Sequence, residues 1–200
     1  MGALWLPLLV ECASGTTADR PCDVYARAST PCVAAHSTVR AMYAKFRGPI
    51  YQLKRADNTT KNITVNAAGY ADAAAHDDFC ASASLCVVQR IYDQSPMANH
   101  LDPAPASKAK YGKDHPCPRQ KPATPVDAMK HPIVMNGKHR VYGAWFEMCN
   151  GYRNDKTRGV AIGNEEESIY MVTSGKRFND GCCFDYGNAE TDVRSDAQPP

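Results

Sequence analysis

Two adjacent cysteines, Cys182 and Cys183, constrain this chain more than any other feature of its sequence. A trans peptide holds neighbouring Cα atoms about 3.8 Å apart, whereas an unstrained disulfide spans roughly 4.4–6.8 Å. Adjacent cysteines are therefore usually each bonded to a partner elsewhere. A bond between the two would instead close a rigid ring, whose polarizable sulfur atoms form a flat plate that can stack on the apolar face of a sugar. Considered alone, this pair favours separate partners and leaves both arrangements open.

The number of cysteines indicates an oxidising compartment. The chain has 200 residues and nine cysteines, far more than a cytosolic enzyme of this size normally carries. An apolar stretch over residues 1–10, followed by small residues up to Ala18, predicts a signal peptide over residues 1–18, although a basic n-region is missing. The alternative, a buried N-terminal strand, is disfavoured by Pro7. We therefore expect residues 19–200 to form one secreted, extracellular domain.

Removing the predicted signal peptide, which contains Cys12, leaves an even number of cysteines for disulfides. Cys22 and Cys32, and likewise Cys80 and Cys86, are close enough in sequence to close small disulfide loops, each worth on the order of 2–3 kcal/mol of stability. If those loops form, Cys117 and Cys149 are expected to bond to each other. The cysteines left after removal of the signal peptide are Cys22, Cys32, Cys80, Cys86, Cys117, Cys149, Cys182 and Cys183.

Other classes of ligand find little support in the sequence. A metal site is the competing use of cysteines, but there is no Cys-x-x-Cys pair and no His-x-x-x-His spacing, so we expect neither metal nor cofactor. The formal net charge of +2 gives no concentrated basic stripe for a nucleic acid. No segment approaches the roughly 20 apolar residues that span a bilayer. Two sequons, at Asn58 and Asn62, predict N-glycosylation, although such triplets also occur by chance.

Hydrophobic periodicity predicts few helices and many strands. Apolar residues recur at helical spacing over residues 36–46, with Ser37 as an N-cap, and residues 71–79 form a weaker helical stretch. Residues 101–132, rich in Pro, Lys and His, predict a long surface loop or insertion. Short β-branched or aromatic runs between turn residues favour an all-β antiparallel sandwich or barrel. The expected strands cover residues 49–53, 62–65, 86–92, 140–146, 168–172 and 182–184.

Several segments of the chain resemble, in order, the catalytic domain of fungal α-L-arabinofuranosidase B, glycoside hydrolase family 54. The resemblance covers about residues 21–191. Agreement in one order over this length is specific, whereas any single segment is weak. The segments are Pro21-Cys22-Asp23-Val24-Tyr25, residues 30–41, Ile50-Tyr51-Gln52-Leu53, Asp78-Phe79-Cys80, Ile91-Tyr92-Asp93-Gln94-Ser95, Asn99-His100-Leu101, Gly151-Tyr152-Arg153-Asn154 and residues 179–191.

The resemblance implies a concanavalin-like antiparallel β-sandwich, incomplete at its C-terminus. It also implies an enzyme that releases terminal α-L-arabinofuranosyl residues, with retention, from arabinan and arabinoxylan in plant cell walls. An arabinose-containing polysaccharide is then the expected partner.

The resemblance further implies how the cysteines are used. Cys22 would bond Cys32, and Cys80 would bond Cys86. Residues 182 and 183 would form a vicinal disulfide against the bound arabinofuranose, which makes Cys182 and Cys183 the expected substrate-binding residues.

The chain departs from the family in three places. Residues 96–98, Pro-Met-Ala, replace a glycine-containing turn. Cys117 and Cys149 have no recognised counterpart. The nucleophilic Glu and the acid/base Asp of the family correspond to positions beyond Thr191, so no catalytic residue is expected within this chain. Retaining hydrolysis needs two carboxyl groups about 5–5.5 Å apart. The sequence leaves open whether this is a genuine short protein or an incomplete gene model.

The carboxylates that are present favour structural roles. Asp185 and Glu190 lie an odd number of positions apart, so on one continuous strand they would lie on opposite faces. Asp93 is expected to cap its own backbone in a turn, and residues 165–167 form a solvated Glu run. Two other functions stay open: a non-catalytic carbohydrate-binding β-sandwich, and a thiol protein built on the adjacent cysteines.

Overall fold

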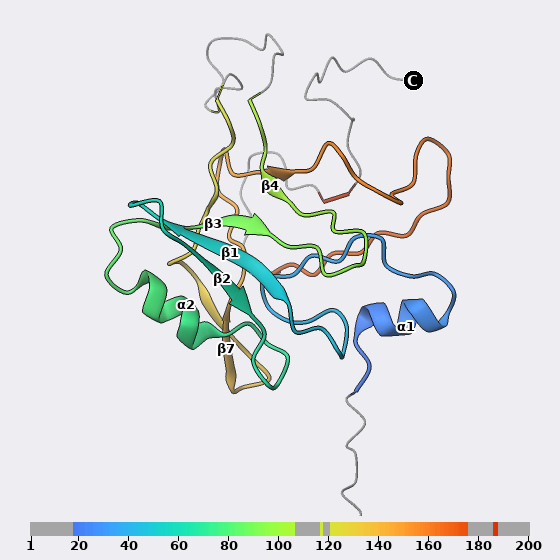
Figure 1. Cartoon of the computed structure of the whole chain (residues 1–200), viewed down its shortest axis with the longest axis horizontal. Coiled ribbons are helices and arrows are strands. Elements are labelled where there is room, and N and C mark those ends of the chain that lie inside the picture. The colour runs from blue at the N-terminus through green and yellow to red at the C-terminus, as the bar shows by residue number, and fades with distance from the viewer. Residues whose placement is uncertain (1–17, 107–116, 118–120, 176–185, 188–200) are drawn as a thin grey trace, which may run out of the picture.

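The structure, a computed structural model, describes residues 18–106, 117, 121–175 and 186–187 (Figure 1). Within them are two short helices, and every strand pair is antiparallel. The expected fold class, an antiparallel all-β protein with one or two short helices, is confirmed, while the concanavalin-like arrangement stays a prediction. The elements are α1 (Pro21–Arg27), β1 (Pro49–Arg55), β2 (Thr60–Thr64), α2 (Ala73–Cys80), β3 (Cys86–Ile91), β4 (Asp102–Pro103), β5 (Val126–Asp127), β6 (Pro132–Met135), β7 (His139–Tyr142) and β8 (Tyr152–Arg153).

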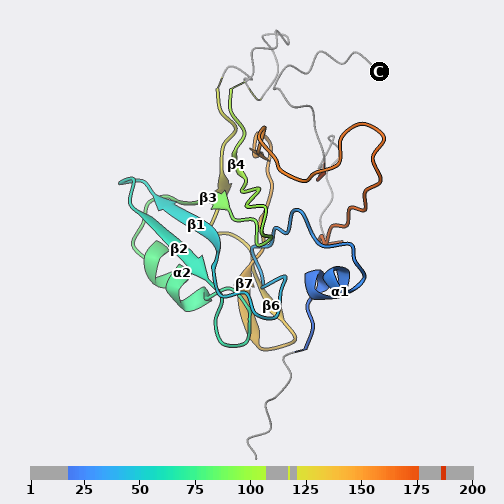
Figure 2. The ribbon, with the colours of Figure 1, turned by 45° about the vertical axis from the view of Figure 1, so that its right-hand side comes forward.

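The core is built on a four-stranded sheet with the order β2-β1-β3-β5. Successive residues of a strand point to opposite faces, and both Ile50 and Tyr51 of β1 are buried, so both faces of the sheet are covered near this point. Two further sheets, β4 with β8 and β6 with β7, contain two strands each. Figures 1 and 2 show α2 beside the β6–β7 hairpin next to this sheet.

Three of the expected strands are confirmed, because β1, β2 and β3 match the predicted runs closely. The expected strand over residues 140–146 is shorter and ends at Tyr142, and residues 168–172 do not form a strand. The predicted run 182–184 lies outside the described residues. The expected insertion over residues 101–132 contains the short strands β4 and β5, each of which pairs with a strand outside the insertion.

The amphipathic helix predicted over residues 36–46 is wrong. Ser37 does cap a local turn, since its Oγ accepts hydrogen bonds from the backbone N–H groups of Val39 and Arg40. Beyond that turn, the backbone of the segment bonds to distant parts of the chain: the Ala41 N–H to the Gly69 carbonyl, and the Met42 N–H to a side chain far along the sequence. These long-range bonds replace the i to i−4 bonds that a helix would need.

Helix α1 was not predicted; it begins at Pro21 and has an acidic residue two positions later. Asp23 Oδ2 accepts hydrogen bonds from the N–H groups of Arg20, 2.9 Å away, and Ala44, 2.7 Å away. The Cys22 N–H donates to the Met42 carbonyl. This seven-residue helix is therefore stabilised by its cap and by the neighbouring segment, and such a short helix has no periodicity to detect.

In the described part of the chain, three disulfides fasten these elements, and they are pairs that were expected: Cys22–Cys32, Cys80–Cys86 and Cys117–Cys149. The first joins the first turn of α1 to the segment that follows the helix, and the second joins α2 to β3. The third connects the insertion to the segment before β8. Tyr152 of β8 secures the same region, because its hydroxyl donates to the Val88 carbonyl and accepts from the Val126 N–H.

A buried histidine connects α2 to the sheet and to the hairpin. The helix begins after Asp72, whose side chain accepts from the Ala75 N–H, and this places His76 at the centre of the core with 1% exposure. Its Nε2 lies 2.8 Å from the Ala128 carbonyl, and its Nδ1 lies 2.8 Å from the Tyr51 hydroxyl. Because a carbonyl only accepts, Nε2 carries the proton and Nδ1 accepts from Tyr51. The ring also stacks on Tyr142, 4.0 Å between centroids.

Burial lowers the pKa of His76 from its ordinary value, so the folded protein prefers the neutral ring. The unfolded chain binds the proton more readily. Stability is therefore fully present above about pH 6.5 and falls as the pH drops through the pKa of the folded state.

We predict that His76→Ala lowers the free energy of unfolding by about 2–5 kcal/mol, since it leaves a cavity and two buried polar groups without a partner. The free energy of unfolding of the variant should also fall less between pH 7.5 and pH 5.5 than that of the parent. Urea unfolding at pH 7.5 and pH 5.5 measures both effects. His131→Asn is the matched control, because His131 is exposed and has a positive φ that asparagine tolerates. Equal stability of His76→Ala and the parent would contradict the prediction.

Candidate site around Asp93

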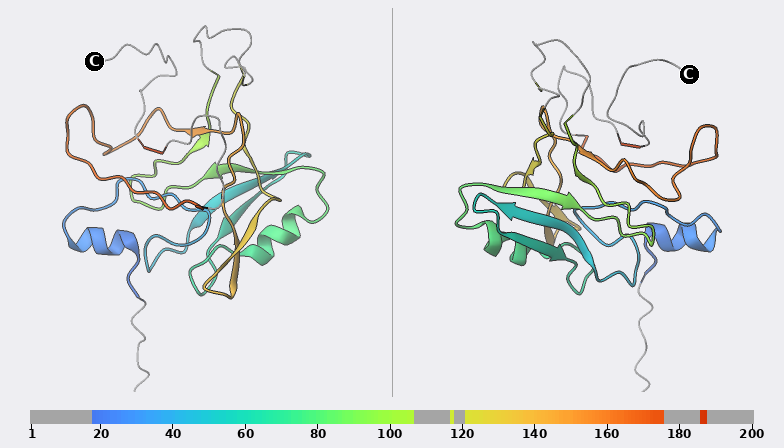
Figure 3. Two further views of the ribbon diagram at one scale, coloured as in Figure 1. Left: turned by 180° about the vertical axis from the view of Figure 1, so that it is seen from behind. Right: turned by 45° about the horizontal axis from the view of Figure 1, so that its top comes forward.

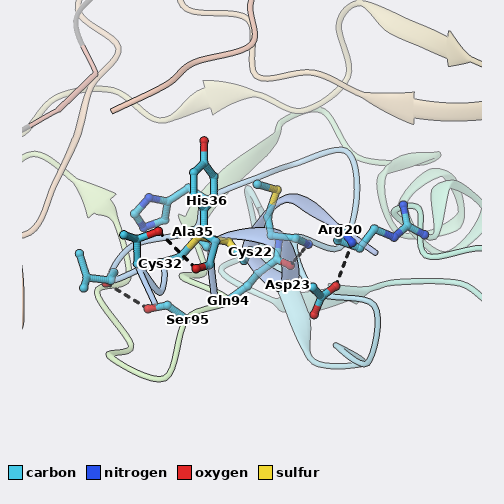
Figure 4. Close-up of a disulfide and its surroundings, with 12 residues drawn as sticks. Arg20, Cys22, Asp23, Cys32, Ala35, His36, Gln94 and Ser95 are labelled. Carbon is cyan, nitrogen blue, oxygen red and sulfur yellow. Dashed lines mark hydrogen bonds between the residues drawn. A yellow bond between two sulfur atoms is a disulfide. The ribbon is translucent and has the colours of Figure 1, made fainter. Parts of the chain in front are cut away.

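Polar side chains that are almost completely buried gather where the chain leaves β3. Asp93, Gln94, Ser95 and Asn99 are each exposed by 7% or less. Burying polar groups is costly unless each one is hydrogen-bonded, so their partners show what the cluster holds together. Figure 4 shows Gln94 and Ser95 beside the Cys22–Cys32 disulfide and His36.

The Asp93 carboxylate accepts four hydrogen bonds, two at each oxygen. Oδ1 accepts from the N–H groups of Ala35 and Ser95, at 2.7 and 2.8 Å. Oδ2 accepts from the Ser95 hydroxyl at 2.6 Å and from the Asn99 N–H at 2.8 Å. As expected from the sequence, Asp93 caps its own backbone. With its acceptor sites filled, this carboxylate is not available as an acid or a nucleophile.

Asn99 extends the cluster to the segment that follows β8. Its Nδ2 donates to the carbonyls of Val33 and Arg158, and its Oδ1 accepts from the Arg158 N–H. Each polar atom of this amide is therefore paired. Three stretches that are far apart in the sequence, near residues 33, 99 and 158, are therefore fixed relative to one another. Both views in Figure 3 show the orange segment that follows β8 on the same side of the molecule as α1.

Gln94 holds the opposite side of the cluster. Its Oε1 accepts from the Met42 N–H at 2.7 Å, and its Nε2 donates to the Arg40 carbonyl at 3.1 Å. These bonds fix the segment that was predicted to be a helix.

His36 connects the cluster to the C-terminal part of the chain. Its Nε2 lies 2.8 Å from the Asn99 carbonyl oxygen, and its Nδ1 lies 3.2 Å from the Tyr186 hydroxyl. The two rings also meet edge to face, with their centroids 6.2 Å apart. Burial lowers the pKa of His36, and burial raises the pKa of Tyr186, so both side chains are neutral near pH 7.

Comparison with known proteins assigns the chain to a family. The family model described as "Alpha-L-arabinofuranosidase B, catalytic" matches residues 21–199. The chain belongs to this family. It is 44% identical to a probable α-L-arabinofuranosidase B of Aspergillus clavatus, over 94% of this chain and 36% of the relative. It is 45% identical to the α-L-arabinofuranosidase B of Aspergillus kawachii, over 92% of this chain and 36% of the relative. The chain thus spans about a third of the length of these relatives.

Solved structures agree with the assignment. A crystal structure of arabinofuranosidase complexed with arabinofuranosyl-α-1,2-xylobiose aligns with a TM-score of 0.64 and 43% identity. The alignment covers 73% of this chain and 29% of the arabinofuranosidase. A family 54 α-L-arabinofuranosidase soaked with a cyclic sulfate inhibitor aligns equally well.

The residues expected to bind the arabinofuranosyl group, Cys182 and Cys183, lie outside the described residues, as do Asp185 and Glu190. Tyr186 is described, and it is the third residue after Cys183. The Glu run over residues 165–167 is exposed, as expected. Sequence reasoning missed His36, Asn99 and Tyr186 as a connected set, although each lies in a segment that carried the family resemblance.

Two features are absent from the described part of this arabinofuranosidase-family chain. No group of three or more potential metal ligands occurs there. Among the same residues, no helix is long and apolar enough to cross a membrane. The site that the structure does describe is the hydrogen-bonded cluster around Asp93, which contacts Tyr186 through Asn99 and His36.

We predict that Asp93→Asn lowers the free energy of unfolding by about 2–4 kcal/mol, because the new amide group points a donor at N–H and O–H donors. Asp57→Asn is the control. Asp57 also accepts from a residue two positions later, Thr59, but it is exposed, so its loss should cost less than about 1 kcal/mol. Chemical denaturation of both variants tests the comparison, and equal costs would show that burial of Asp93 contributes nothing.

Proposed function

We propose that this chain forms the sugar-binding part of the catalytic domain of a retaining α-L-arabinofuranosidase. The match of the family model over residues 21–199 carries the proposal. The related structure bound to arabinofuranosyl-α-1,2-xylobiose supports an arabinose-containing polysaccharide, arabinan or arabinoxylan, as the substrate.

In this proposal the chain binds and orients the sugar. The Cys182–Cys183 pair would offer a flat sulfur surface to the arabinofuranosyl ring, and the Asp93 cluster would keep the neighbouring backbone in place. Hydrolysis with retention requires one carboxylate that attacks the anomeric carbon and one carboxyl group that protonates the leaving oxygen. By the family resemblance, both groups would correspond to positions that follow Thr191. In this proposal the present chain therefore supplies binding, and another part of the domain supplies the chemistry.

A second candidate function is carbohydrate binding without hydrolysis. It is favoured by Asp93, the one Asp or Glu that is buried among the described residues, because hydrogen bonds from the protein saturate its carboxylate. A binding protein would keep the sugar surface and need no free carboxyl pair.

We predict that the 200-residue chain binds arabinofuranosyl-α-1,2-xylobiose but does not hydrolyse an aryl α-L-arabinofuranoside above a heat-killed control. Replacing Cys182 and Cys183 together by alanine should weaken binding at least tenfold, since the stacking surface is lost. Isothermal titration calorimetry and release of the aryl group measure the two activities.

The matched control replaces Cys117 and Cys149 by alanine, which removes a different disulfide and should leave affinity unchanged. Clear turnover that disappears in Glu190→Gln or Asp185→Asn would contradict the assignment of these two residues to structural roles. Unchanged binding after loss of Cys182 and Cys183 would contradict the proposed sugar surface.

We also propose that the protein is secreted. Its disulfides support this, because such bonds persist in oxidising compartments. The asparagines of the two sequons differ in their local structure and contacts. Asn58 lies exposed in the β1–β2 turn with a φ of 66°. Asn62 lies on β2, where its Oδ1 accepts hydrogen bonds from the Tyr92 hydroxyl and the Gln52 amide.

We predict that the protein secreted from a fungal host carries a glycan at Asn58 with higher occupancy than at Asn62. Lys61 separates the two sequons, so trypsin places them on different peptides. Enzymatic deglycosylation in heavy-oxygen water, followed by mass spectrometry, measures the occupancy of each. Higher occupancy at Asn62 would contradict the prediction, and retention of residues 1–18 in the medium would contradict secretion by signal cleavage.

A further inference from the structure

Three arginine side chains gather near the turn that precedes Tyr70, and Arg20 is the first of them. Its Nη2 donates to the Ala68 carbonyl at 3.1 Å, and a Cβ atom on Gly69 would lie only 2.5 Å from the same nitrogen. The guanidinium group therefore rests on this turn, and the missing side chain at Gly69 makes room for it. Figure 4 shows the Arg20 side chain pointing away from the disulfide.

Arg40 is the second, and it faces Tyr70 across an isolated antiparallel bridge. Its Cζ lies 5.9 Å from the centroid of the Tyr70 ring. Its Nε is buried and has no hydrogen-bond partner, and the guanidinium group donates no hydrogen bond to the described part of the chain. A buried donor without a partner is costly, so the fold gains nothing from this nitrogen. The terminal nitrogens have no partner either, but they are not buried.

Arg47 supplies the third positive charge. Its Nη1 donates to the carbonyls of Ala44 and Phe46, at 2.9 and 2.7 Å. The carboxylate of Asp23 accepts from the N–H groups of both Ala44 and Arg20, which joins the segment that carries Arg47 to the first arginine.

The cluster carries more positive charge than the groups around it neutralise. Burial is the largest influence and lowers the pKa of Arg20, and the charges of Arg40 and Arg47 lower it further. Asp23 and Tyr70 act in the opposite direction without reversing the shift. With the carboxylates of the described residues, none of the three guanidinium groups forms an ion pair. Like charges that are held together and partly removed from water favour the binding of an anion.

The donors of the cluster fit an anion that has two oxygens on one atom. A guanidinium group presents its N–H donors as a planar fork, which matches the oxygens of a carboxylate or a phosphate. Arg20 and Arg47 are held in place by the backbone carbonyls to which they donate. Arg40 keeps the donors of its terminal nitrogens available for such an oxyanion.

We propose that Arg20, Arg40 and Arg47 bind an oxyanion, and that this oxyanion is the carboxylate of a uronic acid sugar in an arabinose-containing polysaccharide. The oxyanion site stands on the arginine cluster alone. Its assignment to a sugar carboxylate rests on the proposed function, because the polysaccharide would bring the acidic sugar to the domain. Free inorganic phosphate offers the same oxygen chemistry and is the other source that the test must distinguish.

The test uses the full 200-residue chain, with glucuronate, inorganic phosphate and uncharged glucose as probes at constant ionic strength. Calorimetry should show that glucuronate binds more tightly than phosphate, because a phosphate dianion is more costly to remove from water, and that glucose does not bind. Arg40→Met and Arg47→Met should each weaken glucuronate binding by about tenfold, since charge-assisted hydrogen bonds are lost. Arg27→Met is the matched control: it removes the same charge, but Arg27 is paired with Asp19, so the variant should bind as the parent does.

A second readout separates this role from a structural one. Without added anion, Arg40→Met should unfold at the same urea concentration as the parent or at a higher one, because it removes a repelling charge and a buried donor that has no partner. Glucuronate should raise the unfolding midpoint of the parent but not that of Arg40→Met. A structural Arg40 would instead lower the midpoint when replaced, to the same extent with and without the anion.

The outcomes distinguish this inference from the proposed function. If neither anion binds to the parent or stabilises it, the inference is overturned and the proposed function is untouched. Equal weakening in Arg27→Met would also overturn it, since the effect would then be one of net charge. Phosphate binding as tight as that of glucuronate would overturn the assignment to a sugar. Binding of glucuronate without binding of arabinofuranosyl-α-1,2-xylobiose would contradict the proposed function and leave the oxyanion site standing.

Discussion

The carboxylate of Asp93 is the interaction on which the described structure depends most. Two oxygens organise the turn after β3, the backbone before His36 and the position of Asn99. A buried charge of this kind is tolerated because N–H and O–H dipoles replace its water shell. Removing any one donor would leave the carboxylate underpaired, which explains why the cluster is so densely connected.

Short runs of β-branched or aromatic residues between turn residues were enough to predict the central strands of the fold. The runs that became β1 and β3 contain β-branched or aromatic residues, and residues of both strands are buried in the structure, so local preference and tertiary packing agree. The helical stretch predicted over residues 71–79 corresponds to α2, where local preference and packing also agree. The separation of Cys80 from Cys86 also makes a local disulfide the simplest pairing.

The support of the site could not be predicted, because its residues satisfy each other across long separations in the chain. Residues 36–46 have the periodicity of a helix, yet Gln94 and Asp23 occupy N–H groups of that segment from outside it. The family resemblance drew attention to the cysteines, which have a recognisable chemistry. It did not indicate that the ring of His36 would lie against Tyr186, 150 positions later, since only the fold brings the two together.

The cross-link between Cys117 and Cys149 changes what a protease can do to this molecule. It encloses a stretch that includes the exposed, charged side chain of Lys130 and the whole β6–β7 hairpin. A single cut within this stretch opens a ring without releasing a fragment, so the nicked chain keeps its mass until a reductant is added. The disulfide therefore limits the damage that one cleavage within the enclosed stretch can cause.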